Sequence, residues 1–175
     1  MNQLIGTQSY CAYRGRKYIE ESFGKDRMTG MHYVTIPKLP ECVEADFPDA
    51  LEFGGNGDDG WIKLPVEALS RRWREYVYGL WHGVQVEIHV LHKRGQSILY
   101  CYTNDHVARE WGLSGNQYDG WQGAVSPDEV QLTYIEIHEY PINPPGGVIR
   151  SQDVKVVKIP FSSLDGATVT KVKEE

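Results

Sequence analysis

The stretch YDGW at residues 118–121, followed by SPDEV at residues 126–130, is the part of the sequence that decides the fold. A fainter copy, DDGW at residues 58–61, is followed by PVEA at residues 65–68. In both copies an Asp-Gly turn precedes a Trp, because glycine adopts positive φ without steric cost. Each Trp then begins a strand and can bury about 200 Å² in a core. Each copy therefore predicts the point at which a small β module closes.

The clearer copy continues into a helical turn. Ser126 is placed to cap its N-terminus, Pro127 to be its first residue, and Glu129 to reach back as in a capping box. In the fainter copy Leu64 replaces the capping serine, so only Pro65 marks the turn there. Turn, Trp strand and capped turn thus form one pattern that the chain uses twice.

The chain has 175 residues, which is enough for one domain or for two small subdomains that share a core. Its 11 Tyr, 5 Trp and 18 Gly favour strands and tight turns. No apolar run approaches the roughly 18–20 residues of a membrane-spanning helix, and we expect no secretion signal. Cys11, Cys42 and Cys101 form neither a disulfide framework nor a zinc motif, so we expect a reduced protein of the cytoplasm.

Acidic residues outnumber basic ones, with 24 Asp and Glu against 18 Lys and Arg, so the formal net charge is −6. This balance argues against nucleic acid or an anionic membrane as the main partner, because both attract a basic surface. Residues 41–59 contain no Lys or Arg and predict a surface that steers a basic protein partner. The residues that we expect to bind the partner there are Glu41, Glu44, Asp46, Asp49, Glu52, Asp58 and Asp59. A solvated acidic loop without a partner is the alternative interpretation.

The first half of the chain predicts strands and short connections. Residues 8–23 have the composition of strands, with a turn at residues 14–15. Residues 31–36 predict a second strand. A short helix is expected at residues 41–45, before the acidic, glycine-rich loop at residues 54–60.

Residues 65–79 have the pattern of an amphipathic helix. Four apolar residues recur at spacings of three and four, namely Val66, Leu69, Trp73 and Val77. This spacing places them on one helical face and points Arg72 and Glu75 towards solvent. Gly79 is expected to end the helix.

The second half begins with the strict alternation of apolar and polar residues at 84–90, which is typical of a strand with one buried face. A hairpin turn is expected at residues 94–95. Asn104 is placed to cap a short helix that runs through Trp111. Further strands are expected at residues 97–102, after Trp121, and at 134–140, 154–159 and 168–172.

Both halves place a strand and turn, a second strand, a short helix, the Asp-Gly-Trp turn and a Pro-x-Glu step in the same order. We therefore predict an α+β fold, mostly β, in which two related β modules are joined by a helix. The first module is residues 1–79, with the acidic loop and the linking helix, and the second is residues 80–142. A C-terminal β extension covers residues 148–175. Chance recurrence of strand, turn and Trp in a β-rich protein is the alternative.

Two histidine–glutamate pairs are the candidates for chemistry. Glu87 and His89 share one face of a strand, and Glu136 with His138 repeats this pairing on another strand. Such pairs on adjacent strands are of the residue types that bind zinc. Because no known ligand spacing is met, we expect neither a metal site nor a cofactor.

The sequence contains no motif of nucleophilic catalysis or of nucleotide binding. Cys101 lies in an apolar strand, where a buried thiol is the expected state, and no Gly-x-Ser-x-Gly elbow is present. The glycines at residues 54–57 stand in an acidic context that would repel phosphate. The acidic pairs at residues 58–59 and 128–129 match glycosidase carboxylates by type, but their turn and cap positions already explain them. We therefore expect no enzymatic activity.

Residues 119–130 resemble the closing part of an SH3-like barrel, in which a Trp strand leads through a glycine into a helical turn that begins at proline. The resemblance implies that the two β modules are SH3-like. The acidic and tyrosine positions of the SH3 ligand groove have no match here, so peptide binding of that kind is not implied.

In length, acidity and aromatic β modules the chain resembles the immunity proteins, small acidic cytoplasmic proteins encoded beside bacterial polymorphic toxins. This resemblance implies a cognate inhibitor that binds one toxin domain and blocks it. Tyr118 and Asp119 complete the residues that we expect to contact the partner, since exposed aromatic side chains anchor many interfaces. A small hydrolase or transferase with a His/carboxylate site, and a scaffold or assembly subunit that uses exposed strand edges, are the alternatives.

Overall fold

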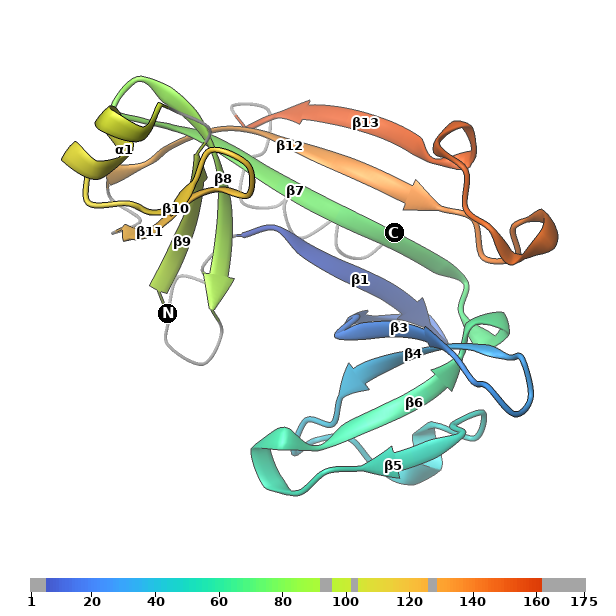
Figure 1. Ribbon diagram of the computed structural model, residues 1–175. Coiled ribbons are helices and arrows are strands. Elements are labelled where there is room, and N and C mark those ends of the chain that lie inside the picture. Colours follow the sequence, from blue (N-terminus) through green and yellow to red (C-terminus); the bar gives the residue numbers. More distant parts are fainter. Residues whose placement is uncertain (1–5, 92–95, 102–103, 126–128, 162–175) are drawn as a thin grey trace. The chain divides into compact units, whose positions relative to one another are not determined.

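The computed structural model describes residues 6–91, 96–101, 104–125 and 129–161 (Figure 1). Strands dominate this part of the chain, so the prediction of a mostly β protein is confirmed. Contacts between residues divide the chain into two compact units. Of the described residues, the N-terminal unit comprises 9–74 and 139–155, and the central unit comprises 6–8, 75–138 and 156–161.

The N-terminal unit begins with a hairpin of strands β1 (Gln8–Tyr13, from Ser9 onward) and β2 (Arg16–Ile19). Arg14 and Gly15 between them have φ values of 48° and 78°. Positive φ at both central residues is the mark of a two-residue hairpin turn whose twist matches that of the strands. The predicted turn is therefore confirmed.

A four-stranded antiparallel sheet follows, in the order β3-β4-β6-β5. Its strands are β3 (Ser22–Lys25), β4 (His32–Pro37), β5 (Glu52–Gly54) and β6 (Trp61–Pro65). Alternate residues of β4 and β6 are fully buried, because successive side chains of a strand point to opposite faces. The core that they build consists of Cys11, Tyr13, Val34, Ile36, Phe47, Ile62, Leu64, Val66 and Leu69.

Short 3-10 helices connect the strands of this unit. They are η1 (Glu44–Asp46), η2 (Gly57–Asp59), η3 (Val66–Ala68), η5 (Pro145–Gly147) and η6 (Ser151–Asp153). The helix expected at residues 41–45 is present only as η1. Val43 precedes η1 with extended backbone angles and without a side-chain cap, so nothing extends this turn towards the N-terminus.

The central unit is built on a sheet with the strand order β10-β11-β9-β8-β7, in which β12 pairs with β7 and β13 with β12. Its strands are β7 (Arg71–Trp81, from Glu75 onward), β8 (Val84–Leu91), β9 (Gln96–Cys101), β10 (Ser114–Asn116), β11 (Gly120–Val125), β12 (Gln131–Tyr140) and β13 (Lys155–Pro160). On β8, Val86 and Ile88 are buried while Glu87 and His89 lie on the other face. The predicted alternation at residues 84–90 is thus confirmed where side chains are described.

Helix α1 (Asp105–Glu110) is the α-helix of the described chain. The side chain of Asn104 accepts a hydrogen bond of 2.9 Å from the backbone N–H of Val107, so the predicted cap is confirmed. Gly112 follows the helix with a φ of 73°, a conformation that favours glycine.

The prediction of a helix at residues 65–79 is wrong. Strand β6 ends at Pro65, η3 follows, and the long strand β7 begins at Arg71. Beyond Trp73, buried and outward residues alternate along β7 with a period of two. Tyrosine, tryptophan and valine predominate here, and these residues pack well on the pleated surface of a sheet.

Two residues of β7 concealed this alternation in the sequence. Glu75 occupies an inward position and is buried, although charged residues usually mark the outer face. Gly79 does not end a helix. A Cβ there would lie 2.8 Å from the carbonyl oxygen of Gln131, so glycine lets β12 approach β7 closely.

The two Asp-Gly-Trp turns have different outcomes. Trp121 is 4% exposed and lies in the core of the central unit, as predicted. Trp61 is only half-buried and does not enter the core of its unit as predicted; its ring lies against Gly54. The capped turn at residues 126–128, the hairpin turn at 94–95 and the strand at 168–172 lie outside the described residues. Within the described chain, no helix has the length and apolar character needed to cross a bilayer.

Candidate partner-binding surface

The seven acidic residues predicted between 41 and 59 all belong to the N-terminal unit, and all seven are exposed. Glu44 and Asp46 lie in η1, Glu52 lies in β5, and the pair at residues 58–59 lies in η2. Short helical turns and one short strand therefore display carboxylates from several neighbouring segments of a single unit. We refer to these seven residues as the acidic surface.

The glycine-rich part of this surface has a fixed backbone. Gly55 has a φ of 70°, and a Cβ there would collide with the carbonyl oxygen of Asp59. Two backbone hydrogen bonds of 3.1 Å close η2, and the N–H of Lys38 donates to the carbonyl of Gly60 at 2.8 Å. The loop thus presents Asp58 and Asp59 in one defined conformation rather than as a solvated coil.

Some acidic side chains also have partners within the unit. Glu44 pairs with Lys38 at 3.1 Å, and Glu52 pairs with Lys63 at 3.6 Å. The glutamate side chains of these pairs are 62% and 56% exposed, so each pair contributes at most about 1 kcal/mol to stability. Their cost in binding is small for the same reason, since water already screens both charges.

Asp49 has a structural role. It accepts a hydrogen bond of 2.8 Å from the hydroxyl of Tyr13, a residue of the buried core. Burial raises the pKa of Tyr13 above its usual value, and the hydrogen bond to Asp49 raises it further. The Tyr13 hydroxyl therefore stays protonated and keeps this part of the acidic segment attached to the core.

Apolar side chains are exposed among the carboxylates. Leu39 is 43% exposed, Val43 58% and Leu51 45%. Large apolar residues at an interface supply burial that charges alone do not, and carboxylates around them provide a polar rim. These three residues were not predictable as a surface group from the sequence, because they follow no helical or strand period.

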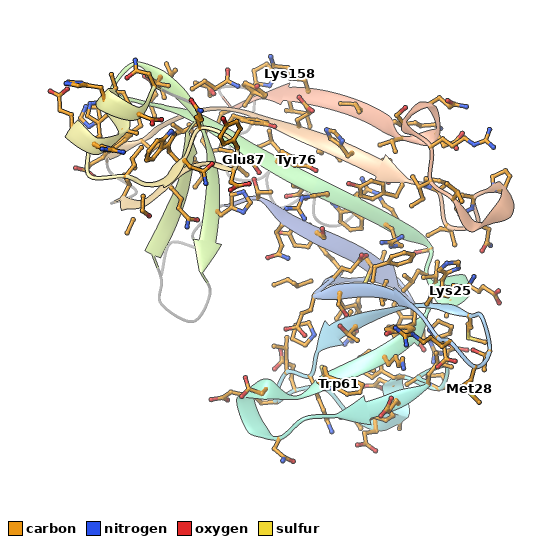
Figure 2. All side chains as sticks on the ribbon, in the orientation of Figure 1. Lys25, Met28, Trp61, Tyr76, Glu87 and Lys158 are labelled. Atoms are coloured by element: carbon orange, nitrogen blue, oxygen red, sulfur yellow. The ribbon has the colours of Figure 1, made fainter. Side chains whose placement is uncertain are left out.

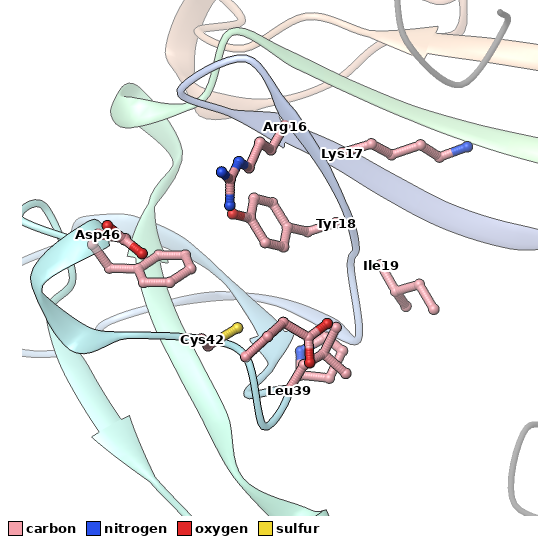
Figure 3. Close-up of a pocket in the computed structure, with 10 residues that line it drawn as sticks. Arg16, Lys17, Tyr18, Ile19, Leu39, Cys42 and Asp46 are labelled. Carbon is pink, nitrogen blue, oxygen red and sulfur yellow. The ribbon is translucent and has the colours of Figure 1, made fainter. Parts of the chain in front are cut away.

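One hollow in the described part of this unit lies between β2 and residues 37–47, and its volume is about 310 Å³ (Figure 3). Apolar and aromatic side chains form most of its wall, among them Tyr18, Ile19 and Phe47. Glu41 and Asp46 of the acidic surface also line it. An apolar cavity beside two carboxylates is the kind of site that receives a side chain of a protein partner.

The second hollow, of about 580 Å³, lies on the other side of the same chain segment. It shares Pro37, Leu39 and Cys42 with the first hollow, and its far wall is the glycine loop with Asp58. Leu39 therefore borders both hollows, and each hollow has at least one acidic residue in its wall.

Tyr118 and Asp119 belong to the central unit, so the structure does not place them in the acidic surface. They lie in the turn between β10 and β11. The side chain of Asn116 accepts hydrogen bonds from the N–H groups of Tyr118 and Asp119, at 2.8 and 2.9 Å, and donates one of 2.7 Å to Asp119. This fixed turn displays Tyr118 with 85% of its surface exposed.

The two histidine–glutamate pairs occur on the strands that flank β7. His89 lies 2.7 Å from Glu87 on β8, and His138 lies 2.5 Å from Glu136 on β12. The pairs do not combine into a metal site, since no three His, Cys, Asp or Glu side chains of the described residues could hold an ion. Neither hollow of the N-terminal unit involves them.

Tyr78 of β7 lies between these pairs. Burial, together with the nearby carboxylates Glu87 and Glu136, raises the pKa of Tyr78 to about 12. Its ring stacks on Tyr134 with 4.8 Å between centroids. The ammonium group of Lys158 lies 3.9 Å from the centroid of the Tyr134 ring. Figure 2 shows Tyr76, Glu87 and Lys158 on the strands of this unit. The aromatic rings thus pack on one another and on their neighbours.

Cys11 is not an activated nucleophile. Cys11 is fully buried, and burial raises the pKa of its thiol to about 12. Cys42 is half-buried and free. The thiolate is the reactive form of cysteine, so Cys11 is inert in the folded protein. The side chain of Cys101 lies outside the described residues.

Comparison of the chain with family models, curated proteins and solved structures found no significant match. The resemblance to SH3-like barrels and to immunity proteins therefore remains a prediction.

Proposed function

We propose that the protein is a non-catalytic inhibitor that binds another protein, namely an immunity protein that neutralises a cognate bacterial toxin by occluding its active site. The observation that carries this proposal is the acidic surface of the N-terminal unit, where exposed carboxylates surround exposed apolar residues and two hollows. The SH3-like character of the β modules belongs to the same proposal.

The charge of this surface favours a basic partner. Residues 41–59 carry seven carboxylates and no Lys or Arg. A concentrated negative potential accelerates encounter with a basic protein and disfavours acidic ones. Enzymes that act on nucleic acid have basic clefts for their substrate, so a toxin of that class would present the complementary face.

The shape of the surface favours tight contact after encounter. Leu39 is exposed and borders both hollows, so a partner that enters either hollow contacts it. Packing of this kind excludes water around a few anchor residues and supplies most of the energy of an interface. Steering by charge and anchoring by apolar contact are thus available on one unit.

The product of a neighbouring toxin gene is the partner to test. Co-expression should yield a complex, and the purified protein should inhibit the toxin's activity. A variant with Glu41→Gln, Asp46→Asn and Asp58→Asn should associate several-fold more slowly with the toxin, and its association rate should depend less on salt. These three residues line the hollows.

A matched control keeps the same change in net charge. Glu21→Gln, Glu67→Gln and Glu110→Gln replace three exposed glutamates outside the acidic surface. This control should retain most of the association rate and its salt dependence. If both triple variants associate at equal rates, the acidic surface does not steer the partner. If the protein forms no complex with any basic toxin, the proposed function is wrong.

Acid–base catalysis is the second candidate function, favoured by the two histidine–glutamate pairs on either side of Tyr78. A histidine hydrogen-bonded to a carboxylate is a suitable general base. If the protein is a hydrolase or transferase of this kind, His89→Gln or His138→Gln should abolish turnover of the substrate while leaving the fold intact. Toxin inhibition that survives both substitutions would exclude this role for the inhibitory activity.

An assembly subunit is the third candidate. In the described chain β13 pairs only with β12, and its Val156 and Val157 are 53% and 52% exposed. Edge strands with exposed apolar residues are prone to pair with another chain. Sedimentation analysis should then show self-association that increases with concentration and decreases on Val157→Lys.

A further inference from the structure

We propose that the hollow between β2 and residues 37–47 is an anchor pocket, which takes an aliphatic or aromatic side chain that stands next to a Lys or Arg on the protein partner. This inference rests on the proposed function, because it names the chemistry that the partner must present to the acidic surface. Four properties of the pocket support it: its lining, its rigidity, its size and the charges at its rim.

The lining is apolar where an inserted side chain would end. Phe47 is 3% exposed and belongs to the core of the unit. Tyr18 and Ile19 come from β2, and Leu39 with Cys42 comes from the segment after β4. A side chain that enters from solvent would therefore exchange water for carbon and sulfur contacts, which is favourable only for an apolar group.

The pocket is formed before any partner arrives. Phe47 stacks on Tyr13 with 5.6 Å between ring centroids and packs edge-on against Tyr18 at 5.7 Å. The hydrogen bond from Tyr13 to Asp49 adds a further constraint on the same segment. Because these groups are already ordered, binding has little conformational entropy to lose on this side of the interface.

The volume suits one side chain. At about 310 Å³ the hollow lies at the lower end of the range for ligand pockets, which is roughly 300–1,000 Å³. A cofactor or extended metabolite would need more space, whereas one large apolar residue from a partner would fill the floor. The adjoining hollow across Leu39 leaves room for the neighbouring residues of the partner.

The rim favours a basic neighbour. Glu41 and Asp46 provide two carboxylates, and Arg16 provides one guanidinium, which lies beside the Tyr18 hydroxyl (Figure 3). Lys17 does not offset the carboxylates at the opening, because its ammonium group lies over the Tyr10 ring, 3.5 Å from the centroid. A Lys or Arg adjacent to the anchor would therefore meet an excess of negative charge.

Capped dipeptides test the pocket without the toxin. The probes are N-acetyl-Trp-Arg-amide, N-acetyl-Trp-Glu-amide and N-acetyl-Ser-Arg-amide, titrated into isotope-labelled protein and followed by NMR. The Trp-Arg probe should produce saturable shifts at Tyr18, Leu39 and Cys42, with a dissociation constant on the order of 1 mM. The Trp-Glu probe should bind up to about fivefold more weakly, and the Ser-Arg probe should show no saturation.

Two variants and a control localise the binding. Cys42→Phe fills the space and should abolish the shifts, and Leu39→Ser removes part of an exposed wall and should weaken binding several-fold. Val148→Phe changes an exposed apolar residue of the same unit that lies outside the acidic surface and lines neither hollow, and it should leave binding unchanged. The amide spectrum of each variant shows whether the variant is folded. If Cys42→Phe does not fold, Leu39→Ser alone tests the pocket.

The outcomes separate this inference from the proposed function. Binding that persists in Leu39→Ser and in folded Cys42→Phe, or equal binding of the Trp-Arg and Ser-Arg probes, would overturn the anchor pocket. Equal binding of the Trp-Arg and Trp-Glu probes would overturn the requirement for a basic neighbour. If the toxin complex forms and responds to the acidic triple variant while these probes fail, the proposed function stands and only the pocket is rejected.

Discussion

Arg72 and Glu20 form a buried, bidentate ion pair in the N-terminal unit. Nε of Arg72 donates to Oε2 of Glu20 at 2.9 Å, and Nη2 donates to Oε1 at 2.6 Å. Each side chain is 7% exposed. The planar guanidinium also lies over the ring of Phe23, 4.3 Å from its centroid. This pair joins the start of β7 to the connection between β2 and β3, so it holds together segments that lie far apart in the sequence.

Removing one member of this pair should destabilise the protein strongly. Arg72→Met or Glu20→Gln is expected to lower the free energy of unfolding by about 3–5 kcal/mol, because the remaining group stays buried without its partner. Urea unfolding measures this difference. The double variant Arg72→Met with Glu20→Leu should recover part of the loss, since it leaves no buried charge.

The exposed pair between Lys38 and Glu44, at 3.1 Å, is the control for the buried one. Lys38→Gln should change the free energy of unfolding by less than about 1 kcal/mol. If Lys38→Gln and Arg72→Met have similar effects, burial is not what makes the Arg72–Glu20 pair important.

Features that depend on neighbouring residues were predictable from the sequence. The turn at residues 14–15, the alternation at residues 84–90 and the cap at Asn104 are all confirmed. Each depends on the backbone preference or the hydrogen-bonding reach of residues only a few positions apart. The exposure of the acidic residues followed in the same way, because unpaired carboxylates are rarely buried.

Features that depend on distant residues were not predictable. The sequence pattern placed Arg72 and Glu75 on a solvent-facing side of a helix, whereas both are buried on a strand. Arg72 can be buried because it pairs with Glu20. This partner lies 52 positions away in the sequence, so the local pattern does not reveal the pair. The hollows likewise need residues 16–19 beside residues 37–47. No short-range pattern specifies such pairings, since tertiary packing overrides local propensity.

The glycine loop of the acidic surface should depend on Gly55. Gly55→Ala places a Cβ against the carbonyl oxygen of Asp59 in a backbone conformation that already disfavours alanine. Gly57→Ala is the matched control, because Gly57 also has positive φ but has open space around its Cα. We expect Gly57→Ala to cost about 1–2 kcal/mol and Gly55→Ala to cost more. Thermal unfolding followed by circular dichroism compares the two, and equal costs would show that the carbonyl contact is unimportant.

The thiols of Cys11 and Cys42 should react very differently. With a pKa of about 12, Cys11 at pH 8 is a thiolate in only about one molecule in ten thousand, and it is buried as well. Iodoacetamide should therefore modify Cys42 in the native protein and Cys11 only after denaturation. Peptide mapping by mass spectrometry identifies the modified residue. Equal labelling of both residues under native conditions would mean that the core around Cys11 opens readily.

The titration of Tyr78 should report on the carboxylates beside it. Its pKa of about 12 exceeds the usual value of 10, so the folded state holds this proton more tightly than the unfolded chain does. The contribution to stability is therefore complete below about pH 10 and is lost as the pH rises towards 12. Ultraviolet absorbance should show a tyrosine that ionises late, and Tyr78→Phe should remove that step.

Replacing one carboxylate separates its contribution to the pKa of Tyr78 from that of burial. Burial is the larger cause, and Glu87 is the next. Glu87→Gln retains the size and burial of the site but removes a negative charge that opposes formation of the phenolate. The pKa of Tyr78 should consequently fall, yet stay above 10, and the loss of stability with rising pH should become smaller. An unchanged titration in Glu87→Gln would mean that the Glu87 carboxylate contributes nothing to the shift, and burial and the other neighbours, Glu136 among them, would remain as its causes.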